Sequence, residues 1–333
     1  MAGSGFGTNF RITTWGETHG AGVGVVVDGC PAGLPLERED VQKYLDRRKP
    51  GQSKYTTQRK EGDQVEILSG IFEGRTTGTP ISMVVYNKDQ RSKDYSNIKD
   101  IYRPGHADFT FDMKYGFRDY RGGGRSSGRE TIGRVAAGAV AAKVLKELGI
   151  EIKAYAKAIA GIEVSKDHFD FAEMNNNPFN MPDKEAAKLV QEKADQMIKE
   201  MDSIGGIIEC QITGMPVGIG ETVFDKLDAE LSKAIMSIGS VKGFEIGDGF
   251  EAANLRGSEN NDDFICVDGK VEKETNHSGG VLGGMSDGSA IVFRAAIKPT
   301  PSIAQTQKTV NRDLDNVEIE IHGRHDPMIV PRA

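Results

Sequence analysis

A stretch rich in arginine and glycine, residues 118–134, carries the most distinctive chemistry of this chain. It holds five arginines, three consecutive glycines and two adjacent serines, and an Ala/Val-rich helical pattern follows at once. Guanidinium groups keep their protons in proteins, so crowding them together costs repulsion unless anions lie among them. Backbone N–H groups, hydroxyls and a helix N-terminus at the same place all suit phosphate or carboxylate. The stretch is interpreted as an anion site, and a solvated run of charge is the alternative.

Two histidines lie in glycine-flanked loops and not on apolar helix faces. His19 is in the segment GETHG, and His106 is in the segment RPGHADFT. A histidine titrates near neutrality, so beside an anion site it can donate a proton to a departing phosphate or a developing anion.

Near the end of the chain, Asp326 stands beside His325 and Arg324. This group is interpreted as a positioned base with an anion contact. His322 and His325 lie three residues apart without helical periodicity, so no metal site is predicted. Basic side chains from separate segments could enclose one ligand with several negative groups. They are Arg47, Arg48, Lys49, Lys54, Arg59, Arg103, Arg125, Arg129, Arg134 and Arg324.

The composition excludes several classes of protein. The chain has 333 residues, a formal net charge of −7, and 38% hydrophobic and 27% charged residues. These values are typical of a globular protein, whereas a global nucleic-acid binder would usually be basic. The cysteines form no CxxC pair, and the P-loop and dinucleotide-binding fingerprints are absent. Without a leader pattern or a long apolar run, we expect a cytoplasmic protein with no membrane segment.

Hydrophobic periodicity predicts strands that alternate with helices. The predicted strands are Gly24–Asp28, Gln64–Ser69, Ile81–Tyr86, Ile150–Val164, Ile207–Thr213, Ala290–Ile297 and Val317–Ile321. The predicted helices are Glu37–Lys49, Glu130–Leu148, Asp183–Ser203 and Thr222–Ile238, with Asp183 as an N-cap. The segments 49–60, 87–129 and 251–284 are predicted to be long functional loops.

An internal echo suggests two related halves. The segment VDGCPAGL, residues 27–34, and the segment ITGMPVGI, residues 212–219, both read as a strand, a G-x-P-x-G turn and a helix. We expect a single domain over 1–333 with two related strand–helix halves, roughly 1–150 and 151–333. Chance similarity is the alternative.

Taken together, the motifs resemble those of the chorismate synthase family. The segments that carry the resemblance are GETHG, RRKPGQSKYTTQR, RPGHADFT, YRGGGRSSGRET, GGVLGGMSDG, KPTPSI and GRHDP. They occur in the family's order, and the resemblance runs over the whole chain. It implies an α/β fold of the α+β type, a β-α-β sandwich with an internal pseudo-two-fold repeat, usually assembled as a homotetramer.

The resemblance also implies an activity. Members of this family are lyases that convert 5-enolpyruvylshikimate 3-phosphate to chorismate by trans-1,4 elimination of phosphate. They require reduced FMN although the reaction has no net redox change. NADPH would serve only indirectly, to reduce the flavin, and we expect an external flavin reductase. The polyanionic small-molecule substrate is the kind of ligand that the arginines suggest.

Roles are implied for particular residues. His19 would protonate the departing phosphate, His106 would manage the proton on the reduced flavin, and Asp326 would help take up the ring proton through the flavin. The residues implied for FMN are Arg125, Ser126, Ser127, Gly239, Ser240, Gly283, Lys298, Pro299, Thr300, Pro301, Ser302 and Arg324. The residues implied for the substrate are Arg48, Lys54, Arg103, Arg129 and Arg134.

The chain departs from the family pattern at a few of these positions. Thr18 and Pro301 stand where serine is commoner, Gly128 where alanine is, and Lys54 where arginine is. None of these changes removes a group with an implied catalytic role.

Two other classes of function are weighed against this reading. An RNA-binding or polyanion-binding module would use the Arg/Tyr/Gly mix before residue 129, but the acidic total and the lack of an aromatic–basic repeat argue against it. A phosphotransferase or phosphatase would use the His and Asp groups without flavin.

Overall fold

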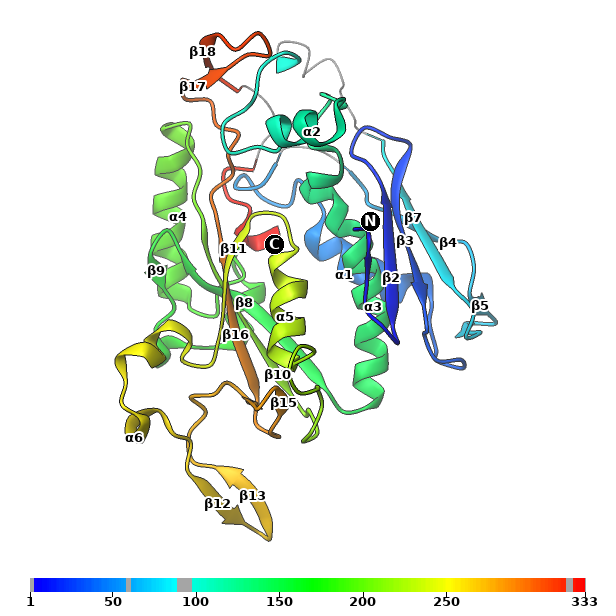
Figure 1. Cartoon of the computed structure of the whole chain (residues 1–333), viewed down its shortest axis with the longest axis vertical. Helices are drawn as coiled ribbons and strands as arrows, with labels where there is room; N and C mark the ends of the chain where they lie inside the picture. Colours follow the sequence, from blue (N-terminus) through cyan, green and yellow to red (C-terminus); the bar gives the residue numbers. More distant parts are fainter. Residues whose placement is uncertain (1–2, 58–60, 89–97, 322–325, 333) are drawn as a thin grey trace. The chain divides into compact units, whose positions relative to one another are not determined.

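The computed structural model describes residues 3–57, 61–88, 98–321 and 326–332. The chain divides into two compact units (Figure 1). Unit 1 comprises Met1–Val144, Gln191–Ile204 and Pro299–Arg332, and unit 2 comprises Leu145–Val190 and Gly205–Lys298. Each unit has its own sheet and its own hydrophobic core. The single domain with two related strand–helix halves, roughly 1–150 and 151–333, stays a prediction.

Unit 1 contains a five-stranded antiparallel sheet in the order β1-β2-β3-β7-β4. Its strands are β1 Gly5–Phe6, β2 Arg11–Gly16, β3 Gly22–Asp28, β7 Ile81–Tyr86 and β4 Val65–Ile67. Two small hairpins pair β5 Ile71–Phe72 with β6 Arg75–Thr76, and β17 Gln307–Val310 with β18 Asn316–Ile319. The helices are α1 Arg38–Arg48, α2 Asp108–Tyr115 and α3 Thr131–Glu147, the last of which continues into unit 2.

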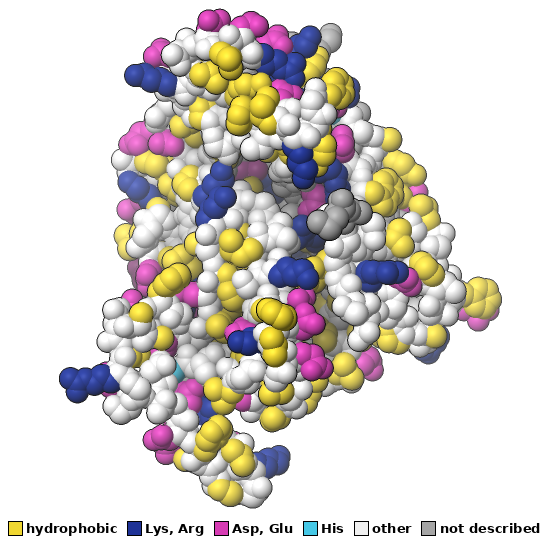
Figure 2. Space-filling view, viewed as in Figure 1, with side chains coloured by type: hydrophobic (Ala, Val, Ile, Leu, Met, Phe, Trp, Pro, Cys, Tyr) yellow, Lys and Arg dark blue, Asp and Glu magenta, His cyan; other side chains and the backbone are white. Residues whose placement is uncertain are grey.

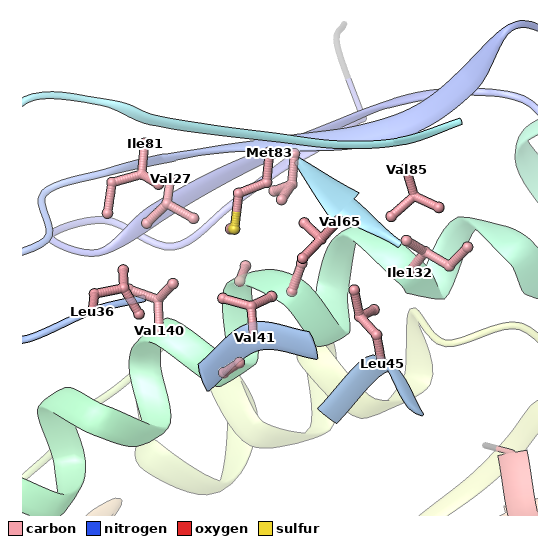
Figure 3. Close-up of a cluster of buried hydrophobic side chains, with 14 of the residues drawn as sticks. Val27, Leu36, Val41, Leu45, Val65, Ile81, Met83, Val85, Ile132 and Val140 are labelled. Atoms are coloured by element: carbon pink, nitrogen blue, oxygen red, sulfur yellow. The ribbon is translucent and has the colours of Figure 1, made fainter. Parts of the chain in front are cut away.

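The core of unit 1 lies between this sheet and the helices α1 and α3 (Figure 3). Val27 of β3 points from the sheet toward Val41 of α1 and Val140 of α3, and Val25 of the same strand belongs to this buried cluster. Helix α3 is rich in Ala and Gly, and a Cβ added at Gly133 would lie 3.0 Å from a backbone oxygen of β3. The small residues therefore let α3 approach the sheet closely, and α3 begins directly after the arginine-rich stretch.

Unit 2 contains a second five-stranded antiparallel sheet, in the order β11-β16-β10-β8-β9. Its strands are β11 Val241–Ile246, β16 Ile291–Ile297, β10 Gly206–Thr213, β8 Glu151–Ile159 and β9 Ile162–Glu163. Two hairpins pair β12 Phe264–Val267 with β13 Lys270–Lys273, and β14 Val281–Leu282 with β15 Met285–Ser286. The helices are α5 Leu227–Met236, the short α6 Gly257–Asn260, and α4 Lys184–Lys199, which begins in unit 2 and ends in unit 1.

One side of the second sheet carries the core of unit 2. Cys210 and Phe293 face each other across β10 and β16 and pack with Ile212, Ile291 and residues of α5. Both sheets are thus antiparallel and covered by helices, which confirms the predicted mixed α/β class of the α+β type.

A hydroxyl bridges the turn that follows the central strand of unit 1. Thr76 Oγ1 donates to Pro31 O at 2.6 Å and accepts from Leu34 N at 3.0 Å. Gly33 N donates to Thr76 O at 2.8 Å. These bonds tie the G-x-P-x-G turn to the β5–β6 hairpin.

The corresponding turn of unit 2 is tied in the same way. Ser286 Oγ donates to Pro216 O at 2.5 Å and accepts from Ile219 N at 2.9 Å. Gly218 N donates to Ser286 O at 2.8 Å. The two segments that resemble each other in sequence therefore share a bonding scheme, each with a hairpin as partner.

Most of the predicted elements are confirmed near their predicted ends. Asp183 caps α4, since its Oδ1 accepts from Glu185 N at 2.9 Å and Ala186 N at 3.0 Å. The single strand predicted over Ile150–Val164 is wrong, because a turn with positive φ at Ala160 and Gly161 splits it into β8 and β9. The helix predicted from Thr222 begins only at Leu227, after a turn in which Val223 has φ 68°.

The loop predicted over residues 87–129 contains helix α2, which the sequence pattern did not indicate. Likewise, hairpin β12–β13 lies within the loop predicted over 251–284. In the described part of the chain, no helix combines the length and apolar character that crossing a bilayer requires.

Candidate active site

His19 lies in the tight connection between β2 and β3. Gly16, at the end of β2, has φ +87°, and a Cβ there would lie 2.2 Å from Gly22 O, so only glycine fits. The turn is closed by a hydrogen bond of 3.2 Å from Gly20 N to Glu17 O. Thr18 and His19 are both buried. The glycines of GETHG thus serve to place two polar side chains in the interior of unit 1.

Arg103, His106 and Asp108 form a second group at the start of helix α2. Arg103 donates to both carboxylate oxygens of Asp108, from Nε and Nη2 at 2.8 Å each, and its side chain is buried. Arg103 Nη2 also donates to Gly122 O at 3.2 Å, which links this group to the glycine run. Burial alone would raise the pKa of Asp108, but hydrogen bonds and charge from Arg103 and His106 lower it far below its usual range.

The ring of His106 stands between a donor and an acceptor. Its Nδ1 is 3.1 Å from Arg103 Nη2 and 3.2 Å from Asp108 Oδ1. A guanidinium can only donate and a carboxylate can only accept, so Nδ1 accepts from Arg103 when it carries no proton and donates to Asp108 when it carries one. Either tautomer of the ring therefore keeps one hydrogen bond to this pair.

The arginines of residues 118–134 each lie within ion-pair distance of a carboxylate of the chain. The pairs are Arg118 with Asp108 and Asp112, Arg121 with Asp119, Arg125 and Arg134 with Glu130, and Arg129 with Asp63 and Glu61. The premise that a bound anion must relieve their repulsion is thus corrected, because internal acids already do so. Which of these arginines contact a ligand stays a prediction.

Asp63 joins two of the residues implied for the substrate. Its Oδ1 accepts from Arg129 Nη1 at 2.9 Å, and its Oδ2 accepts from Arg48 Nη1 at 3.2 Å. All three side chains are buried. Burial, together with the charges of Arg332 and Arg129, lowers the pKa of Arg48 to about 10, and the charge of Asp63 opposes that change. Two guanidinium groups therefore share one carboxylate in the interior.

Several buried donors of unit 1 have no hydrogen-bond partner among the described residues. They include Thr18 Oγ1, Arg48 Nε, Arg129 Nη2 and Thr300 Oγ1. Buried polar atoms are nearly always paired, so such a set is typical of a place that a ligand completes. Thr18 lies in the turn that carries His19, and Arg48 and Arg129 both bind Asp63. These hydroxyl and guanidinium donors suit an anionic ligand.

Asp326 is held by two other segments of unit 1. Its Oδ1 accepts from Thr57 N at 2.8 Å, and Arg332 Nη1 donates to both of its oxygens, at 2.8 and 2.7 Å. Arg332 Nε donates in turn to Arg48 O at 3.3 Å, which links Asp326 to helix α1. Arg324, His322 and His325 lie outside the described residues, as does Arg59.

Some of the residues implied for FMN lie in unit 1. Arg125 reaches the end of β2, donating from Nη1 to Gly16 O at 3.1 Å and from Nη2 to Thr14 Oγ1 at 2.6 Å. Ser127 Oγ accepts from Arg129 N at 3.2 Å and caps a 3-10 turn, so this serine has a structural role, while Ser126 lies in the preceding 3-10 turn. The others in this unit are Pro299, Thr300, Pro301 and Ser302.

The remaining residues implied for FMN lie in unit 2. Lys298 N donates to Ser240 O at 2.9 Å, and Gly239 precedes that serine. Burial, and then the charge of Lys242, lower the pKa of Lys298. Gly283 has φ +61° in the two-residue turn between β14 and β15, so its conformation has a structural explanation. Whether these residues contact FMN is untested.

Two of the residues implied for the substrate lie nearer the surface. Lys54 Nζ pairs with Asp195 at 2.7 Å, and its side chain is 62% exposed. Arg134 pairs with Glu130 one helical turn before it, at 2.9 Å. On the face shown in Figure 2, Lys and Arg side chains are interspersed with Asp and Glu side chains. The buried basic groups of unit 1 thus differ from the mixed charge of that surface.

The structure brings together segments that are far apart in the sequence. Arg125 links the arginine-rich stretch to β2, Arg103 links it to α2, and Arg48 Nη2 lies 3.4 Å from Gly128 O. Sequence reasoning missed Asp63 and Asp108, the acids that hold these arginines. Asp108 could have been found from its place two residues after His106, whereas no local signal marks Asp63.

Comparisons with known proteins agree with this arrangement. The family model described as chorismate synthase matches residues 10–333. Chorismate synthases of Lachnospira eligens and Agathobacter rectalis are 69% and 66% identical over 333 residues, which is all of this chain and 91% of each relative. A crystal structure of chorismate synthase is similar with a TM-score of 0.75 and 33% identity, over 88% of this chain and 85% of that one. This chain therefore belongs to the chorismate synthase family.

Proposed function

We propose that the protein is a lyase that eliminates phosphate from 5-enolpyruvylshikimate 3-phosphate in a trans-1,4 sense and yields chorismate. The membership of the family supports the activity. One structural observation carries the proposal furthest: hydrogen bonds join GETHG, RPGHADFT and the arginine-rich stretch within unit 1, where several buried donors have no hydrogen-bond partner in the described part of the chain. A substrate with two carboxylates and a phosphate offers the acceptors that these donors need.

His19 is proposed as the general acid. It is buried in a turn whose geometry is fixed by Gly16, next to the buried hydroxyl of Thr18. An imidazolium held there can protonate the phosphate oxygen as the carbon–oxygen bond breaks. Arg48 and Arg129 are proposed to bind the negative groups of the substrate, because Arg48 Nε and Arg129 Nη2 have no hydrogen-bond partner among the residues that the structure describes.

The residues in unit 1 fit a flavin with a phosphate tail, since the donor set contains the Arg125 guanidinium and the buried Thr300 hydroxyl. When bound, reduced FMN supplies electron density to the substrate as phosphate leaves. His106 offers an imidazole held at Nδ1 by Arg103 and Asp108, and Asp326 offers a carboxylate oriented by Arg332 and Thr57. We propose that His106 and Asp326 handle the protons of the reaction, while NADPH acts only through a separate flavin reductase.

The proposal is tested by anaerobic assay of phosphate and chorismate release with chemically reduced FMN. We expect turnover with reduced FMN and none without flavin. His19→Ala and His106→Ala should each lose about 10²- to 10⁴-fold in kcat while still binding FMN and substrate. Full activity in either variant would remove that residue from the mechanism, and flavin-independent phosphate release would contradict the proposed reaction.

A homotetramer, a cytoplasmic location and the lack of nucleic-acid and membrane partners belong to the same proposal. Sedimentation analysis of the purified protein measures the first. Turnover driven by NADPH with only the protein and FMN would show that no external reductase is needed.

A further inference from the structure

Asn87, the residue that follows β7, is bound to the turn that carries His19. Its side-chain Nδ2 donates to Glu17 O at 2.9 Å and to Gly20 O at 2.8 Å. Its backbone N donates to Ala21 O at 3.0 Å. Three hydrogen bonds from one residue therefore hold the turn on both sides of His19.

The orientation of the Asn87 amide is fixed by its partners. Both turn partners are carbonyl oxygens, which can only accept, so they require the NH₂ group. The other end faces Arg129 Nε at 2.5 Å, which can only donate, so it must be the amide oxygen. Only an amide offers two donors on one end and an acceptor on the other, so the contacts at this position require an amide, which asparagine supplies.

Arg129 connects the amide to the Asp63 cluster. Its Nε donates to Asn87 Oδ1, and its Nη1 donates to Asp63 Oδ1 at 2.9 Å. Its side chain is buried, so this geometry is held on several sides. Because the same planar amide binds Arg129 and the turn that carries His19, a movement of the Arg129 guanidinium would also move that turn.

We propose that Asn87 is a positioning residue, which sets the place of the His19 imidazole and links it to the guanidinium of Arg129. The inference rests on the proposed roles of His19 as acid and Arg129 as substrate ligand. Displacing a catalytic group by about 1 Å can lower a rate by about 10²-fold. The amide therefore controls turnover without contacting the reacting atoms itself.

Two substitutions separate the two ends of the amide. Asn87→Asp keeps an oxygen for Arg129 but replaces the NH₂ donors with a second oxygen, which repels the carbonyls of Glu17 and Gly20. Asn87→Ala removes both ends. Asn311→Asp is the matched control, because Asn311 Nδ2 donates to Asp315 at 3.1 Å, within the turn after β17 and not in the turn that carries His19.

The kinetic experiment compares these variants in the anaerobic assay. Asn87→Asp should lower kcat at least about tenfold with a substrate KM within about threefold of the unsubstituted protein, since the Arg129 contact survives. Asn87→Ala should lower kcat and also raise KM by more than about threefold. Asn311→Asp should change neither. Because a loss of folded protein lowers the apparent kcat without changing KM, the folded fraction of each variant is measured by circular dichroism and kcat is expressed per folded molecule.

A second readout does not depend on activity. Trp15 is the only tryptophan of the chain and stands one residue before Gly16, so its emission reports on the turn. The imidazole signals of His19 can be assigned in NMR spectra by comparison with His19→Gln. We expect both the His19 signals and the Trp15 emission to change in Asn87→Asp and Asn87→Ala but not in Asn311→Asp.

Unchanged kcat in both Asn87 variants would overturn the inference, and so would a loss of kcat with unchanged His19 signals and Trp15 emission. If Asn87→Asp fails to fold, Asn87→Ala carries the same test. Full activity of His19→Ala would instead overturn the proposed role of His19. In that case, the spectra would still decide whether Asn87 positions the ring.

Discussion

Each unit of the molecule buries a cluster of charged side chains, and the two clusters are built differently. In unit 1, Arg48 and Arg129 share the carboxylate of Asp63. In unit 2, Lys273 at the end of β13 lies between Asp262, at 3.0 Å, and Asp287, at 2.7 Å. The first cluster has two guanidinium groups on one carboxylate, with Glu61 farther off at 3.8 Å from Arg129 Nη2, whereas the second has two anions around one cation.

The two clusters differ in whether their hydrogen-bond donors have acceptors. Lys273 Nζ also lies 2.7 Å from Ser278 Oγ and 3.1 Å from Asn276 Oδ1, so each of its three protons has an acceptor. Arg48 Nε and Arg129 Nη2, by contrast, have no hydrogen-bond partner among the described residues. A saturated cluster, in which every donor has an acceptor, stabilises the fold. An unsaturated cluster, which keeps donors without acceptors, is suited to binding a ligand. The unsaturated cluster is the one next to the His19 turn.

The largest effect on stability is expected from the saturated cluster. Lys273→Met would leave Asp262 and Asp287 buried without their cation, which should lower the free energy of unfolding by about 3–5 kcal/mol. Denaturant titration followed by circular dichroism measures this change. The control is Lys270→Met, at the other end of the same strand, where the residue is exposed. If Lys273→Met were as stable as the control, the cluster would not contribute to the stability of unit 2.

Ligand binding should stabilise the protein through the other cluster. Substrate with oxidised FMN at about 100 times the dissociation constant should add about 2.7 kcal/mol to the free energy of unfolding. Thermal melting with and without ligands measures the gain. Lys270→Met should gain as much as the unsubstituted protein. A melting curve unchanged at saturating ligand would argue against an anion site in unit 1.

Removing one guanidinium from unit 1 should affect binding more than folding. Arg48→Met eliminates a cation held next to Arg332 and Arg129, and Asp63 keeps its bond to Arg129. We expect a loss of about 1.5–3 kcal/mol in substrate binding, measured by calorimetry. The free energy of unfolding should change by less than about 1 kcal/mol. The opposite result, a large loss of stability with unchanged affinity, would make Arg48 a structural residue.

The smallest effect is expected on the free energy of unfolding at acidic pH, through Asp287 of unit 2. Burial would raise the pKa of Asp287, but hydrogen bonds from Lys273 and Ser289, with the charge of Lys273, lower it overall. Its folded pKa is therefore below the unfolded value of about 3.9, so its contribution is complete above about pH 5 and is lost as the pH falls further. Between pH 5 and 3, Asp287→Asn should lose about 1 kcal/mol less stability than the unsubstituted protein. Asp268→Asn, in the turn of hairpin β12–β13, should follow the unsubstituted protein.

Local signals in the sequence predicted the ends of α1 and α3 and the start of α4 well. Pro50-Gly51 follows α1, Gly149 follows α3, and Asp183 caps α4, because each of these residues acts on its neighbours alone. Helix α2 was not predicted, because its short sequence lies between glycine-rich and arginine-rich segments that resemble loops. Helix caps and helix-breaking residues can be predicted from one sequence because they act only on residues close to them in the chain.

The polar partners of the site could not be predicted in the same way. Asp63 and Arg129 are 66 positions apart, and Asn87 and Glu17 are 70 apart. The sequence showed which arginines and histidines were unusual, but pairing across such distances depends on the register of β3, β4 and β7. For the same reason, the interpretation of an arginine cluster that needs a bound anion was incomplete: acids elsewhere in the chain already neutralise it.

The hydroxyl-bridged turn found once in each unit has an evolutionary consequence. Thr76 and Ser286 differ by one methyl group, yet each bridges a proline carbonyl and a backbone amide in the same order. Such a pair is expected if the two halves arose by tandem copying of one gene, because both copies would begin with the same turn and the same hairpin partner.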